Sequence, residues 1–419
     1  MTFRMKKRYI SDHHTSVLLF VFIWIMYAVV YMTKNCYTAA MAGIVENGIM
    51  TKSETGLIAA CFYLSYAPFQ VIGGKLADKY PPEVLLIIGL AGAAVSNLLI
   101  YLNQNYIFML IVWTFNGAIQ FGIWPGVFKI VSSNLERAYR KKAIFLISLS
   151  SSSGMALAFI TAAFIKDWRN NFLLSAILLF FFTAATAIVY YFINKKVHFT
   201  EEPVDNIPSV AQTATVTNVS TKKVLFGAGL AFLLIPFVIT DLVSLGVKNF
   251  APTMLMESYD AISPMIGNFL NVFLIIAGVL GTFLVKFIYP RFVKEELSGV
   301  RNIGFISLPL LALCIFVGMI PSTLTVVSLC IISVCSAIMA TLRSYYSASF
   351  AKYGKNGEVA GIVNACSSLG VVVQTYGLSK VADAYNWSTV FSVITTLWVI
   401  FLVVTSLVLP LWKKFKREN

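Results

Sequence analysis

The chain has 419 residues, of which 58% are hydrophobic and only 12% are charged, and its mean hydropathy is +0.80. Soluble globular proteins carry about 25% charged residues, so this composition excludes a soluble protein and indicates one that crosses a membrane many times. A formal net charge of +14 would suggest nucleic-acid binding in a soluble protein. Here the basic residues lie in short loops and at the chain ends, so we expect no nucleic-acid partner.

Twelve apolar stretches follow one another along the chain, each close to the ~20 residues that a helix needs to cross a bilayer. They lie at 16–41, 54–76, 83–103, 106–131, 142–165, 170–194, 223–250, 262–288, 300–320, 322–349, 357–382 and 388–411. We therefore predict an all-α membrane protein with twelve transmembrane helices in contact with the lipid bilayer.

The sixth and seventh stretches are separated by a polar segment, residues 196–222, which contains two prolines and no helical pattern of apolar residues. Such a composition predicts a flexible linker. We therefore expect two six-helix halves, residues 1–195 and 223–419, joined by this linker.

The two halves carry a related pattern. Trp168 precedes Phe172 at the start of the sixth stretch, and Trp387 precedes Phe391 at the start of the twelfth. Two matched halves with a central site between them are typical of secondary transporters.

Lysine and arginine gather in the loops on one side of the predicted helices. The largest clusters are at 4–8, 137–142, 195–196 and 413–417. Because cytoplasmic loops carry an excess of basic residues, we expect both termini in the cytoplasm and a multi-pass protein of the cytoplasmic membrane.

The first predicted helix carries the leading candidate for a binding site. Lys34 lies inside it, with Tyr27 seven residues and Tyr31 three residues earlier, so all three share one helical face. A charge at membrane depth is costly and by default faces a water-filled cavity with a functional partner. We expect Lys34 to bind an anionic group of a substrate and the two tyrosines to donate hydrogen bonds. The alternative is a lysine that reaches the outer surface.

Other polar groups lie inside later predicted helices. Asp241 and Lys248 share one face of the seventh, Arg343 lies in the tenth and Gln120 in the fourth. Asp241 has three candidate roles: counter-ion to Lys34 or Arg343, proton carrier, or binder of a substrate amine. Arg343 is either a substrate ligand or half of a structural pair. Gln120 is a candidate cavity residue, and Lys248 is expected near the outer interface.

The loop between the second and third stretches reads Gly73-Gly74-Lys75-Leu76-Ala77-Asp78-Lys79. It resembles the loop signature of the major facilitator superfamily. Glycine permits close helix packing, and Asp78 could pair with a helix N-terminus or a base. The resemblance therefore implies that Gly74, Asp78 and Lys79 form a latch for one access state.

Further motifs resemble the organophosphate:phosphate antiporters of that superfamily. They are KNCYTAAM from Lys34, and Gly117, Gln120, Trp124 and Pro125 in the fourth stretch. The resemblance implies that Tyr27 and Tyr31 are pocket tyrosines and that an arginine pair clamps phosphate. Here Lys34 and Ser244 replace those arginines. Lysine lacks the bidentate fork of arginine, so the substrate site is divergent.

These observations predict a secondary active transporter that moves a small organic anion by alternating access. The anion could be an organophosphate, a carboxylate or a sugar acid, and a proton or a counter-anion would provide coupling. The expected binding residues are Lys34, Tyr27, Tyr31, Arg343, Asp241 and Gln120, and Asp241 is also the candidate coupling residue.

Alternatives of other kinds remain. A proton-coupled drug or metabolite exporter of the same fold would depend mainly on Asp241, and a non-transporting sensor is a third possibility. An enzyme is disfavoured because the predicted helices contain no catalytic constellation. The three histidines lie outside the predicted helices, and we interpret the six cysteines as small, buried hydrophobic residues. We therefore expect no metal and no cofactor. We also expect a monomer.

Overall fold

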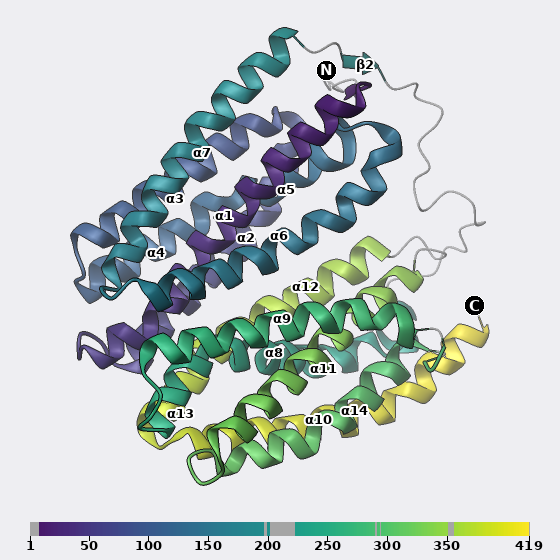
Figure 1. Cartoon of the computed structure of the whole chain (residues 1–419). Coiled ribbons are helices and arrows are strands. Elements are labelled where there is room, and N and C mark those ends of the chain that lie inside the picture. The colour runs from purple at the N-terminus through teal and green to yellow at the C-terminus, as the bar shows by residue number, and fades with distance from the viewer. Residues whose placement is uncertain are drawn as a thin grey trace. The chain divides into compact units, whose positions relative to one another are not determined.

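The computed structural model describes residues 8–196, 199–201, 223–289, 291–293, 295–350 and 356–418. The chain divides into two compact units, residues 1–207 and 208–419, called here the N-terminal and C-terminal units. Each is a bundle of long helices (Figure 1).

The N-terminal unit begins with a short strand, β1 (Arg8–Ile10), and continues with helices joined by brief turns. The helices are α1 (His13–Glu46), α2 (Lys52–Lys79), α3 (Pro82–Leu102), α4 (Tyr106–Ile119), α5 (Ile123–Lys129), α6 (Arg137–Phe164) and α7 (Arg169–Lys196). A second strand, β2 (Phe199–Glu201), pairs antiparallel with β1. This ribbon was not predicted, and β2 lies in the segment expected to be a flexible linker. It places the start of α1 beside the end of α7.

The C-terminal unit is also helical. Its helices are α8 (Leu230–Ser258), α9 (Pro264–Ile288), α10 (Glu296–Leu313), α11 (Ser322–Ala348), α12 (Asn356–Val372), α13 (Ser379–Ala384) and α14 (Trp387–Glu418). Trp387 and Phe391 are buried at the start of α14, as Trp168 and Phe172 are near the start of α7 in the other unit.

Eleven of the described helical segments are long and apolar enough to cross a membrane. The remaining predicted span, 357–382, corresponds to α12, a π-helical turn η6 (Val373–Leu378) and α13, because that turn interrupts the regular helix. The twelve-helix prediction therefore agrees with the fold.

The seventh predicted span was misplaced. It was expected at 223–250, but α8 begins only at Leu230 and runs to Ser258. Gly229 adopts φ 76°, a left-handed conformation that separates α8 from the preceding π-helical turn η3 (Lys223–Gly227).

The fourth predicted span is helical from α4 to η2 but is irregular inside. Between α4 and α5 lies a 3₁₀ turn, η1 (Gln120–Gly122), and α5 passes into a π-helical turn, η2 (Ile130–Asn134). Pro125 has no amide hydrogen, so the carbonyl of Phe121 four residues earlier has no donor within the helix. A side chain at Gly73 would collide with that carbonyl, so α2 packs directly against the irregular turn.

Candidate functional site

The ammonium of Lys34 lies among four aromatic rings within the N-terminal unit. Its Nζ atom is 4.0 Å from the ring centroid of Tyr66, 5.1 Å from Tyr63, 5.3 Å from Phe62 and 5.5 Å from Tyr31. Lys34 has no hydrogen-bond or ion-pair partner among the residues that the structure describes. The faces of aromatic rings attract a cation. These four rings, called here the aromatic cage, therefore orient the ammonium without neutralising its charge.

Close helix contacts hold the cage in place. The backbone of α4 approaches α2 at Gly117, where an added Cβ would collide with the carbonyl of Phe62. The hydroxyl of Ser65 donates to the carbonyl of Thr114 at 2.7 Å across the same contact. These contacts fix the position of Phe62, and with it the α2 side of the cage, relative to α4.

The α1 side of the cage is fixed by α6. A side chain at Gly154 would collide with the carbonyl of Ala28, and its Cβ would lie 2.7 Å from Cβ of Tyr31. Glycine therefore allows α6 to pack directly on the turn that carries Tyr31.

The predicted pocket tyrosines lie together. The rings of Tyr27 and Tyr31 meet edge to face with centroids 5.2 Å apart, and Tyr27 stacks on Trp124 at 5.4 Å. Gln120, one turn before Trp124, is buried and donates from Nε2 to Oδ1 of Asn116 at 2.9 Å. The Nδ2 atom of Asn116 is buried and has no hydrogen-bond partner within the described structure. A polar pair therefore lies one turn from the aromatic group.

A buried ion pair forms the polar centre of the C-terminal unit. The two terminal nitrogens of Arg343 on α11 donate to the two carboxylate oxygens of Asp241 on α8, each at 2.6 Å. Arg343 is 5% exposed and Asp241 is 8% exposed. Sequence reasoning left Arg343 between a substrate role and a structural pair, and the structure places it in a pair. Of the three roles weighed for Asp241, the geometry shows a counter-ion to Arg343.

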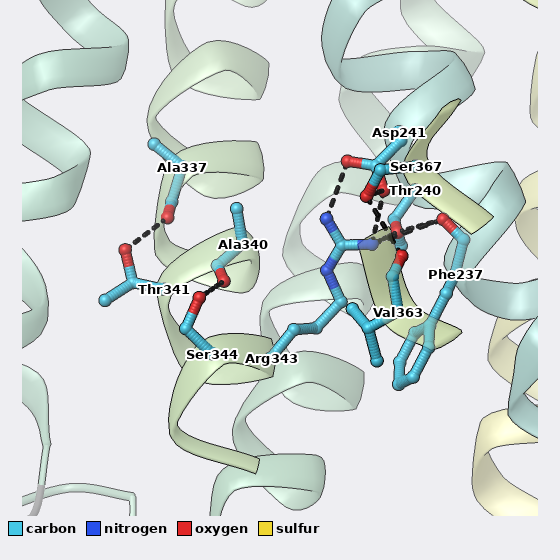
Figure 2. Close-up of polar contacts among 10 residues, drawn as sticks. All are labelled: Phe237, Thr240, Asp241, Ala337, Ala340, Thr341, Arg343, Ser344, Val363 and Ser367. Carbon is cyan, nitrogen blue, oxygen red and sulfur yellow. Dashed lines mark hydrogen bonds and ion pairs between the residues drawn. The ribbon is translucent and has the colours of Figure 1, made fainter. Parts of the chain in front are cut away.

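Neighbouring groups complete this pair. The guanidinium also donates to the hydroxyl of Thr240 at 2.8 Å and to the carbonyl of Phe237 at 3.2 Å. Ser367 of α12 donates its hydroxyl to Asp241 at 2.6 Å. Figure 2 shows Arg343 reaching from α11 toward these groups, whereas Ser344 bonds back to its own helix.

Close packing between α12 and α8 also holds Asp241 in position. A Cβ at Gly370 would lie 2.7 Å from the carbonyl of Val238 and 3.1 Å from Cβ of Asp241. Bidentate arginine–carboxylate pairs are strong and geometrically specific, and here only Nε of Arg343 has no hydrogen-bond partner among the guanidinium nitrogens in the described structure. Three helices, α8, α11 and α12, are therefore joined at Asp241.

The loop motif behaves differently at its two glycines. Gly73 packs on the carbonyl of Phe121, whereas an added Cβ at Gly74 would meet no described atom within 4 Å. Lys79 is exposed at the end of α2, and the side chain of Asp78 lies outside the described residues. Among the described residues of its own unit, Gly74 therefore has no close neighbour that would require a glycine.

Lys129 at the end of α5 contacts the backbone at the end of α2. Its Nζ donates to the carbonyls of Ala77 and Tyr80, where α2 ends. A cation at a helix C-terminus satisfies free carbonyls and complements the helix dipole. Lys129 is thus a cap for α2.

Several contacts were not predicted from the sequence. The missed groups are Phe62, Tyr63 and Tyr66 around Lys34, and Thr240 and Ser367 around Arg343. The run Phe62-Tyr63-Leu64-Ser65-Tyr66 is a polar and aromatic interruption in an apolar helix, and it could have indicated the first group. No comparable local signal distinguishes Thr240 or Ser367 from other hydroxyls in the helices.

A family model described as Major Facilitator Superfamily matches residues 23–375. The Membrane sensor protein UhpC of Escherichia coli (strain K12) is 29% identical over 98 residues, covering 23% of this chain and 22% of that protein. The Glycerol-3-phosphate transporter of Bacillus subtilis (strain 168) is 24% identical over 293 residues, covering 66% of each chain. The matched segments thus span about a fifth and about two thirds of these two relatives. The resemblance seen in the loop and helix motifs is confirmed, at low identity.

A solved structure agrees with the fold. The crystal structure of a bacterial homolog to human lysosomal transporter Spinster, inward-facing and unoccupied, has a TM-score of 0.71 and 12% sequence identity. The match covers 97% of this chain and 98% of that one. Because the identity is low, this similarity extends to the fold alone.

Proposed function

This chain belongs to the Major Facilitator Superfamily, and we propose that it is a membrane transporter, not an enzyme, that moves a small organic anion by alternating access. The single observation that carries this proposal is the ammonium of Lys34. It lies inside a membrane-spanning helix, is oriented by aromatic rings and has no ion-pair partner within the described residues. A charge kept unpaired at membrane depth is a functional group by default.

The chemistry of the site supports an anionic solute in particular. Lys34 offers positive charge, Tyr27 and Tyr31 lie on the same helical face, and Gln120 lies one turn from the indole that stacks on Tyr27. The relatives include proteins named as transporters of glycerol 3-phosphate and hexose phosphate. We propose an organophosphate, a carboxylate or a sugar acid as the solute.

The binding test is a thermal-shift screen of the purified protein with organic phosphates, sugar acids and dicarboxylates. A ligand at about 100 times its Kd adds roughly 2.7 kcal/mol of stability. We expect a shift in the wild type that Lys34→Ala abolishes. Lys195→Ala is a matched control, because Lys195 lies over the ring of Tyr191 at 5.7 Å but is exposed near the end of α7. An equal shift in wild type and Lys34→Ala would refute the anchor role.

For coupling, we propose that Asp241 and Arg343 act as one element. Asp241 carries the charge that neutralises Arg343, so adding a proton to Asp241 would release the guanidinium. Under this proposal Asp241→Asn loses uptake driven by a pH gradient yet keeps exchange of substrate across the membrane. Unchanged pH-driven uptake by that variant would point to a counter-anion as the coupling species.

The proposed setting is the cytoplasmic membrane, with both termini in the cytoplasm and a monomer as the working unit. The clusters of lysine and arginine at the chain ends and in alternate loops support this orientation. A reporter that fluoresces only in the cytoplasm, fused after Asn419, should be bright. A fusion protein of normal abundance that does not fluoresce would show the opposite orientation, with the C-terminus outside the cytoplasm.

A second candidate is a sensor that binds its ligand without transporting it. It is favoured by the similarity to a relative named as a membrane sensor protein. Saturable binding by purified protein with no flux into proteoliposomes would support the sensor over the transporter.

A further inference from the structure

A cleft with basic walls lies in the C-terminal unit, near the start of α10 and the end of α14. These two helices pack side by side (Figure 1), and the cleft that they line has a volume of about 720 Å³. Four of its lining side chains are basic, one from α10 and three from α14: Arg301, Lys413, Lys414 and Arg417. No acidic side chain lines it within the part of the chain that the structure describes. The cleft is thus a concave surface on which positive charge is concentrated.

Part of this charge is not neutralised by neighbouring carboxylates. Lys413 has one acid nearby, since its Nζ lies 3.7 Å from Oε2 of Glu295. Arg301 donates from Nε and Nη2 to Oδ1 of Asn302, at 3.2 and 2.9 Å, and that amide carries no charge. Arg417 is exposed and has no hydrogen-bond or ion-pair partner among the described residues. Arg301 and Arg417 are therefore cations without a carboxylate partner in the described structure.

The walls of the cleft are held by close packing one turn away. A Cβ added to Gly304 of α10 would lie 2.6 Å from Cε1 of Phe401 and 2.9 Å from Cδ2 of Leu402 on α14. The indole of Trp398 donates to the carbonyl of Gly304 at 2.9 Å across the same contact. Arg301 lies one turn before Gly304, so this contact fixes its helix relative to α14. The cleft is therefore preformed.

Each of the two helices continues from the cleft into an apolar stripe on its surface. On α10, Phe305 lies four residues after Arg301 and thus on the same face, and it is 52% exposed. On α14, Leu407 and Leu411 lie seven and three residues before Lys414, again on one face, and Leu407 is 71% exposed. Large apolar side chains on the surface of a membrane-spanning helix face the acyl chains of the bilayer. The basic cleft therefore adjoins the surface that contacts lipid.

We propose that this cleft binds an anionic phospholipid of the phosphatidylglycerol type, with its phosphate against Arg301 and Arg417 and its acyl chains along the two apolar stripes. Arginine suits a phosphate because its planar fork donates two parallel hydrogen bonds. Basic pockets between membrane-spanning helices at the membrane surface favour anionic headgroups. A soluble anion would use the basic groups but would gain nothing from the apolar stripes. The cleft shares no lining residue with the candidate functional site, so this inference goes beyond the proposed function and does not depend on it.

The experiment measures lipid binding to the purified full-length protein in a neutral detergent by native mass spectrometry. Dioleoyl phosphatidylglycerol is compared with dioleoyl phosphatidylcholine, which has the same acyl chains and a phosphate but no net charge. A basic residue near the membrane surface contributes about 5-fold to the affinity for an anionic lipid. We therefore expect the wild type to prefer phosphatidylglycerol by about 10-fold or more, and the double variant Arg301→Gln, Arg417→Gln to lose most of this preference.

Matched variants separate the cleft from a general effect of charge. The double variant Lys195→Gln, Lys380→Gln removes two charges from exposed positions outside the cleft and should keep the preference. Arg417→Gln alone should lower the preference by about 5-fold and leave the melting temperature unchanged, because Arg417 has no partner to lose in the described structure. Equal preference in the wild type and the double arginine variant would refute the site. An equal loss in both double variants would also refute it, because net charge alone would then explain the attraction.

A competition experiment identifies the source of the phosphate. Dimethyl phosphate reproduces the phosphodiester of the lipid without its acyl chains, and an excess of it should leave the lipid bound. Displacement of phosphatidylglycerol by dimethyl phosphate would show a site for soluble phosphate esters and would overturn the proposal of a lipid site.

Discussion

Arg343 and Asp241, which are 102 residues apart in the sequence, form a bidentate ion pair. Each terminal guanidinium nitrogen lies 2.6 Å from a different carboxylate oxygen. Neither residue is exposed by more than a tenth, and both lie in helices of the C-terminal unit. Such a pair holds the two helices together. It can also act as a switch, because removing either charge leaves the other buried and unpaired.

The first prediction concerns this pair. Arg343→Met leaves Asp241 as an isolated buried charge and should lower the free energy of unfolding by about 3–5 kcal/mol. The double variant Arg343→Met, Asp241→Leu should recover most of that loss, because no unpaired charge remains. Thermal unfolding in detergent measures both, and equal instability of the single and double variants would argue against a charge effect.

The second prediction concerns the aromatic cage. Tyr66→Leu removes the ring nearest to the ammonium of Lys34 and should lower the free energy of unfolding by about 0.5–2 kcal/mol more than Tyr66→Phe does. Tyr66→Phe keeps the ring and loses only the bond that Gln70 donates to its hydroxyl at 2.6 Å. Urea or thermal unfolding provides the comparison, and identical values for the two variants would contradict a cation–π contribution.

The third prediction uses two adjacent glycines. Gly73→Ala should lower the free energy of unfolding by about 1–3 kcal/mol, because its methyl group would collide with the carbonyl of Phe121. Gly74→Ala should be nearly neutral for stability, because its methyl group meets no described atom within 4 Å. If Gly74→Ala is stable but slows transport, the predicted latch role of the motif gains support. If the Gly74→Ala protein is stable and transports normally, the latch role of Gly74 is refuted.

The fourth prediction concerns Lys129 at the end of α2. Lys129→Met removes the donor to the carbonyls of Ala77 and Tyr80 and should lower the free energy of unfolding by about 0.5–2 kcal/mol. Ligand affinity, measured by calorimetry, should not change. Lys79→Met, at an exposed position in the same helix end, is the matched control for stability. A large loss of affinity in Lys129→Met would assign this lysine to the substrate site instead.

The fifth prediction concerns pH at the turn between α6 and α7. Hydrogen bonds from the side chain of Arg169 lower the pKa of the Asp167 carboxyl, although partial burial opposes this effect. The folded pKa lies below the unfolded value of about 3.9, so the stabilisation is present above that pH and is lost as the pH falls through the folded value. Because the pair is exposed, Asp167→Asn should cost no more than about 1 kcal/mol at pH 7.

That cost should shrink as the pH falls below about 4. Melting temperatures of wild type and Asp167→Asn at pH 7, 5 and the lowest pH at which both remain folded would test the trend. A difference that stays constant across this range would show that the charge of Asp167 does not stabilise the turn.

The membrane-spanning helices could be predicted from the sequence alone, because hydropathy is a local property that accumulates over about 20 residues. The periodicity of a helix likewise determined that Tyr27, Tyr31 and Lys34 share one face. The start of α8 was harder to predict, since it depends on the left-handed conformation of Gly229, which the sequence permits but does not require.

Only the tertiary structure decided which groups meet across helices. The aromatic cage of Lys34, the pairing of Arg343 with Asp241 and the contact of Lys248 with Gly278 each join residues from different helices. Such contacts depend on the rotation and register of one helix against another. Those are determined by close approaches at residues such as Gly117, Gly154 and Gly370, and the pattern within a single helix does not specify them.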